Sequence, residues 1–104
     1  RGWVQAAGST MTAVLQRSSC EEKWGLFWNF ELFAHRQARV VEELQEGSAA
    51  ELHNRRQDDA GQAERCIRPG DCLLRANGRS APDEIRAVLT AELEVSLEFP
   101  RADA

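Results

Sequence analysis

Residues 93–99 carry the clearest structural signal in the chain, a strict alternation of apolar and polar side chains. The apolar members are Leu93, Val95, Leu97 and Phe99, and Glu94, Ser96 and Glu98 stand between them. Successive side chains of a β-strand point to opposite faces, so this pattern predicts a strand with one buried face. Pro100 ends it, because proline has no backbone N–H to donate to a neighbouring strand. The fold therefore contains a β-sheet, whose other strands the rest of the chain must supply.

Four further runs of apolar residues predict strands. They cover residues 12–16, 24–33, 38–44 and 72–76. The second run is the most aromatic part of the sequence, and its alternating residues indicate one buried face. Residues 53–65 have almost no apolar side chain, so we expect a loop or helix insertion there that lies in solvent.

Two helix starts complete the set of elements. Ser48 is followed three residues later by Glu51, which is a capping-box pattern. Pro82 precedes two acidic residues, which favours the first turn of a second helix. The order β, β, β, α, β, α, β is not a βαβ alternation. It predicts the α+β class, with a mostly antiparallel sheet or a small, partly open barrel.

Composition limits the classes of partner. The chain has 104 residues, a mass of 11.7 kDa and a net charge of −4, which fits one domain and disfavours nucleic acid or an anionic membrane. No apolar run approaches the roughly 20 residues of a membrane span.

The odd, unpaired set of Cys20, Cys66 and Cys72 indicates a reducing compartment. We therefore expect a cytoplasmic monomer that needs no metal or cofactor, with an N-terminal arm over 1–11 and a tail over 102–104.

The sequence offers no recognisable catalytic set. Phosphate-binding loops, nucleophile elbows and paired carboxylates are not found among its motifs. His35 and His53 lie in polar segments and are expected to be solvated, and Cys72 lies in a predicted strand as a small buried residue. We therefore predict that the domain is not an enzyme.

Two sequence runs are similar to a known family. Residues 47–51 read Gly-Ser-Ala-Ala-Glu, and residues 67–78 read Ile-Arg-Pro-Gly-Asp-Cys-Leu-Leu-Arg-Ala-Asn-Gly. Together with the helix and strand that follow, they resemble the PDZ domain, over residues 12–101. The resemblance implies a small antiparallel β-sandwich or partly open barrel of five to six strands with two helices. It also implies a protein-interaction module, an adaptor or scaffold domain that binds C-terminal or extended peptides by β-strand addition.

The resemblance also implies a binding site. In the family, backbone amides of a loop before the second strand hold the carboxylate of the peptide, and that strand and the second helix form the groove. The loop residues here are Lys23, Trp24, Gly25, Leu26 and Phe27. The groove residues are Trp28, Asn29, Phe30, Pro82, Arg86 and Leu89. Lys23 or Arg17 would support the carboxylate. Pro82 offers no partner for a Ser or Thr hydroxyl of the peptide, whereas Arg86 would favour an acidic side chain.

Two alternatives stay open at this point. The first is an accessory PDZ-like domain of a larger enzyme, such as a protease. The second is a structural domain whose own side chains fill the groove. Direct peptide binding separates the interaction module from the structural domain.

Overall fold

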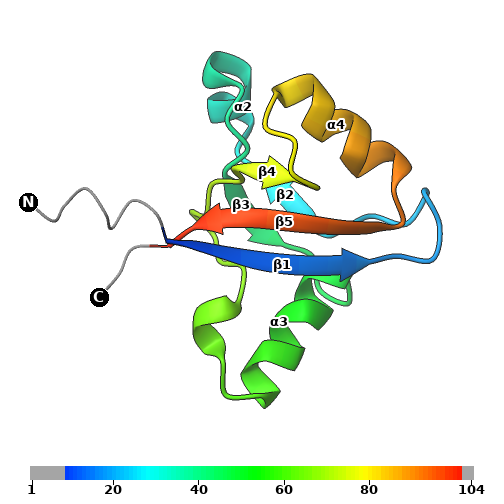
Figure 1. Cartoon of the computed structure of the whole chain (residues 1–104), viewed down its shortest axis with the longest axis vertical. Helices are drawn as coiled ribbons and strands as arrows, with labels where there is room; N and C mark the ends of the chain where they lie inside the picture. Colours follow the sequence, from blue (N-terminus) through cyan, green and yellow to red (C-terminus); the bar gives the residue numbers. More distant parts are fainter. Residues whose placement is uncertain (1–8, 102–104) are drawn as a thin grey trace, which may run out of the picture.

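The computed structural model, which describes residues 9–101, forms an α+β domain with three α-helices and five strands in two antiparallel sheets (Figure 1). In chain order the elements are β1 (Thr10–Gln16), β2 (Leu26–Trp28), α2 (Phe30–Arg36), β3 (Val41–Leu44), α3 (Ala49–Asp59), the 3-10 turn η1 (Ala63–Arg65), β4 (Arg75–Ala76), α4 (Pro82–Ala91) and β5 (Glu94–Pro100). The predicted class and the antiparallel pairing are confirmed. The two sheets do not close into a barrel within the described residues.

The larger sheet has the order β1-β5-β4. Its register runs from Thr10 opposite Pro100 to Gln16 opposite Glu94. Every second residue of β1 and β5 is buried, as the alternation over 93–99 predicts for β5. β5 itself begins and ends one residue later than that range. The buried set is Met11, Ala13, Leu15, Val95, Leu97 and Phe99. These side chains form the centre of the hydrophobic core.

Two helices cover this sheet from different sides. α3 packs against β1 and α4 against β4, and Figure 1 shows them below and above the long β1–β5 pair. α3 begins as predicted, with the Ser48 hydroxyl accepting the Glu51 N–H at 3.2 Å. The Glu51 carboxylate in turn accepts the Gly47 N–H at 2.6 Å. α4 begins at Pro82, also as predicted, and buries Ile85 in the core.

The prediction of one long strand over residues 24–33 is wrong after Trp28. The Asn29 side chain accepts the Leu32 N–H at 2.9 Å and caps the start of α2. Phe30, which lies within the strand expected over 24–33, is 81% exposed as the first residue of this helix. Asn is a strong N-cap because its short side chain reaches the orphan N–H groups of the first turn. The expected two helices are therefore three.

Other predicted boundaries also move. The strand expected over 38–44 is β3, which begins at Val41, with Val40 in an isolated bridge to Cys72. The strand expected over 72–76 is reduced to β4. β1 begins at Thr10, so the last residues of the expected arm over 1–11 belong to the domain. Residues 1–8 of that arm, and the tail over 102–104, lie outside the described residues.

The insertion over residues 53–65 is not simply a solvated loop. Its first part continues α3 to Asp59, and His53 is buried with Nε2 3.0 Å from the Arg65 carbonyl. The Asn54 amide accepts the Ile67 N–H at 2.7 Å and donates to the Ile67 carbonyl at 2.8 Å. The expectation of a solvated His53 is therefore wrong.

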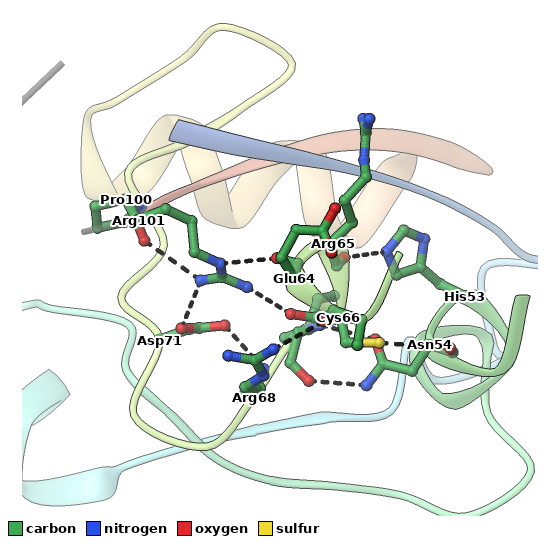
Figure 2. Close-up of polar contacts among 11 residues, drawn as sticks. His53, Asn54, Glu64, Arg65, Cys66, Arg68, Asp71, Pro100 and Arg101 are labelled. Atoms are coloured by element: carbon green, nitrogen blue, oxygen red, sulfur yellow. Dashed lines mark hydrogen bonds and ion pairs between the residues drawn. The ribbon is translucent and has the colours of Figure 1, made fainter. Parts of the chain in front are cut away.

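The segment after η1 is held from the other end of the chain (Figure 2). Arg101 forms an ion pair with Asp71 at 2.8 Å and donates to the Cys66 carbonyl. Burial, together with the Asp58 carboxylate, raises the pKa of the Cys66 thiol. These residues stabilise the fold, since most of their polar groups hydrogen-bond to one another.

Candidate functional site

Two cavities lie side by side between β2 and α4, because both are lined by Trp28, Leu89 and Thr90. The loop cavity, of about 610 Å³, extends along the segment before β2. The α2 cavity, of about 430 Å³, extends toward α2. We call the two together the β2–α4 groove.

One wall of the groove is the free edge of β2. Among the described strands, β2 pairs with β3 alone. The Gln45 N–H donates to the Gly25 carbonyl at 2.8 Å, and Leu26 lies opposite Leu44. In an antiparallel ladder hydrogen-bonded and non-hydrogen-bonded pairs alternate, so the Leu26 N–H and carbonyl point away from β3. This edge can therefore pair with a further extended chain.

The predicted loop residues come together along one cavity. Residues 23–27 all line the loop cavity, and its far wall is Leu89 and Thr90 of α4. Lys23 and Phe27 are exposed, whereas Trp24, Gly25 and Leu26 are buried. The side chains thus present both an apolar floor and an exposed amine.

Gly25 fixes the shape of this loop. Its φ of +91° lies in the region that favours glycine. A Cβ built on it would overlap the Ser48 side chain, which caps α3. The entry to β2 therefore requires glycine both for its conformation and for this close approach.

Arg17 links the loop to the end of α4. Its five N–H groups all donate to backbone carbonyls, and its guanidinium carbon lies 4.2 Å from the centre of the Trp24 ring. The acceptors are the carbonyls of Cys20, Glu22, Leu89, Thr90 and Glu92. The Trp24 indole N–H donates to the Leu89 carbonyl at 2.8 Å. Arg17 therefore has no donor left for a ligand carboxylate, which leaves Lys23 as the basic group of the predicted pair.

The predicted groove residues separate into two groups. Trp28 and Leu89 line both cavities, and Phe30 and Arg86 line the α2 cavity. Asn29 and Pro82 serve the fold instead. The Asn29 amide caps α2 and donates to Glu42 at 3.1 Å, and the Pro82 carbonyl accepts from Arg39.

Three residues that line the α2 cavity were not predicted from the sequence: Phe33, Arg39 and Thr90, the last of which also lines the loop cavity. The guanidinium carbon of Arg39 lies 4.8 Å from the centre of the Phe33 ring, and the Arg39 side chain is buried. Burial, and to a smaller extent the charge of Arg86, lowers the pKa of Arg39. A charged residue directly before Val40 and Val41 in a predicted strand was the available signal.

The residues that the structure describes contain no candidate metal site. No group of three or more His, Cys, Asp or Glu side chains within residues 9–101 is placed to hold a metal ion. The three cysteines are free, and no helix in this range has the length and apolar character to cross a bilayer. The chain matches no protein-family model, and a search of curated proteins returned no match.

Proposed function

We propose that this chain is a PDZ-like interaction module that binds the C-terminal segment of partner proteins by strand addition. The observation that carries the proposal is the β2–α4 groove, which combines an unpaired strand edge with a glycine loop at one end. An extended peptide would pair with the backbone of Leu26 and Trp28. The Leu26 N–H and carbonyl face away from β3, and the alternation along a strand places those of Trp28, two residues later, on the same side.

The end of the peptide would lie in the loop cavity. Its last side chain would pack against Leu26 and Leu89, which line that cavity. Its carboxylate would accept from backbone N–H groups next to Gly25, where the positive φ turns the loop. The exposed amine of Lys23 adds a favourable charge nearby. The open volume of the groove favours this reading over a groove filled by its own side chains.

Three free cysteines agree with a reducing, cytoplasmic setting. We therefore propose a monomeric cytoplasmic adaptor or scaffold domain with no cofactor.

A library of labelled C-terminal peptides, measured by fluorescence polarisation, tests the proposal. We expect dissociation constants in the micromolar range, about −6 to −8 kcal/mol. Each bound peptide is then measured again as its C-terminal amide, which keeps the side chains and removes the charge. Amidation should weaken binding at least tenfold. Equal binding of the acid and the amide would contradict the carboxylate loop.

A further inference from the structure

Arg39 is a buried cation with few partners. Arg39 as a whole is 6% exposed. Its side chain makes one hydrogen bond, from Nη1 to the Pro82 carbonyl at 3.3 Å. No carboxylate in residues 9–101 lies within ion-pair distance of it. The guanidinium has five N–H donors, so most of them are unused. A buried charge normally has a paired group, because removing it from water is costly.

The wall opposite carries a second positive charge. Arg86, exposed on α4, lines the same cavity as Arg39. The remaining walls are mostly apolar and include Trp28, Phe30 and Phe33. Both charged residues that line this cavity are therefore positive, in a chain whose net charge is −4. Low-dielectric walls strengthen the attraction of such a pair for an anion.

We propose that the α2 cavity binds an anionic side chain of the peptide, a carboxylate or a phosphate, between Arg39 and Arg86. The inference rests on the proposed function, since the peptide strand brings the anion into place. Planar guanidinium groups suit either anion because they bind its oxygens with parallel N–H donors.

The position of this side chain follows from strand geometry. If the last peptide residue lies beside Leu26, an antiparallel strand places the residue two before it beside Trp28, about 7 Å away. Side chains two residues apart share a face of a strand. The third residue from the end therefore points to the same side as the last one, where α4 presents Arg86 and Leu89.

Two pairs of free-acid peptides test the proposal. The first pair differs only by Glu or Gln at the third position from the end, and the second by phosphoserine or Ser. We expect at least one anionic peptide to bind about tenfold more tightly than its neutral partner at low salt, with the preference shrinking as salt screens the charges. The pair that shows the preference identifies carboxylate or phosphate as the ligand group. The proposal is overturned if both pairs bind alike.

Matched variants assign the effect to the cavity. Arg86→Gln should remove most of the preference for the anionic peptide. Arg79→Gln changes the same charge at an exposed residue paired with Glu84, outside the lining of the cavity, and should keep it. Loss of the preference in both variants would indicate a general charge effect and overturn the proposal.

A measurement without peptide keeps the two proposals separate. Titration of the wild-type domain with inorganic phosphate, followed by the side-chain Nε–H signals of the arginines, reports on the cavity directly. Saturable shifts at Arg39 and Arg86, but not at Arg79, are expected. Phosphate binding with no dependence on a peptide carboxylate would contradict the proposed function alone. If peptide binding depends on the peptide's carboxylate but shows neither a preference for the anionic peptide nor the shifts of the arginine signals, this inference alone is overturned.

Discussion

At the scale of single residues, the groove depends on side chains that serve the fold and the site together. Arg17 satisfies five carbonyls from the loop and from the end of α4, and Trp24 stacks on it. Both therefore hold the two walls of the loop cavity at a fixed separation. Hydrogen bonds to a charged group are individually stronger than neutral ones. The loop thus gains its order both from Gly25 and from contacts with α4, which lies far away in sequence.

Gly25 allows a direct test of this arrangement. Gly25→Ala should lower the free energy of unfolding by more than 2 kcal/mol, because a methyl group adds a collision with Ser48 to the cost of a positive φ. Gly70→Ala is the matched control: its φ is +97°, and a Cβ there meets nothing within 4 Å. That change should cost only about 1–2 kcal/mol. Urea denaturation of both variants gives the comparison, and equal losses would show that the contact with Ser48 is unimportant.

At the scale of elements, the sequence predicts those whose signals do not compete with another pattern. The alternation over 93–99 is maintained for seven residues, and Ser48 and Pro82 mark helix starts by local chemistry, so these elements are found where expected. Residues 24–33 mislead because their aromatic alternation outweighs a single capping residue, Asn29. Local hydrogen bonding then decides the structure against the apolar pattern.

The same contrast applies to the candidate site. Residues 23–27 and Leu89 were predicted from the resemblance, and the structure places them along one cavity. Arg39 and Phe33 were not predicted, because their contact is made only once α2 turns the chain back toward β3. No local sequence pattern specifies such an approach.

The insertion gives an element-scale prediction. Asn54→Ala should destabilise the domain by about 1–3 kcal/mol, because it leaves the Ile67 N–H and carbonyl without their partner. Arg55 is the next residue of α3. Arg55→Ala removes only an exposed ion pair with Glu51 and should lower the free energy of unfolding by at most about 0.5–1 kcal/mol. Thermal unfolding of the two variants tests this. An Asn54→Ala variant as stable as the Arg55→Ala variant would show that the insertion is only loosely attached.

At the scale of the whole molecule, the groove lies between parts that are far apart in sequence. β2 belongs to the small sheet, and α4 leads directly into β5 at the centre of the large one (Figure 1). A ligand that contacts both β2 and α4 therefore adds contacts that link the small sheet to the large one. Binding to the native state alone should then raise the stability of the domain as a whole.

This stabilisation can be measured by calorimetry. At a peptide concentration one hundred times the dissociation constant, the gain is about 2.7 kcal/mol, which raises the melting temperature by roughly 10–20 °C for a domain of this size. Phe30→Ala should reduce the shift, because Phe30 lines the α2 cavity and is 81% exposed, so its loss should hardly affect the free domain. Val14→Ala alters an apolar residue of β1 that is 47% exposed and lines cavities against α3 instead, so it should leave the shift unchanged. Equal shifts for the two variants would mean that the peptide binds somewhere other than the β2–α4 groove.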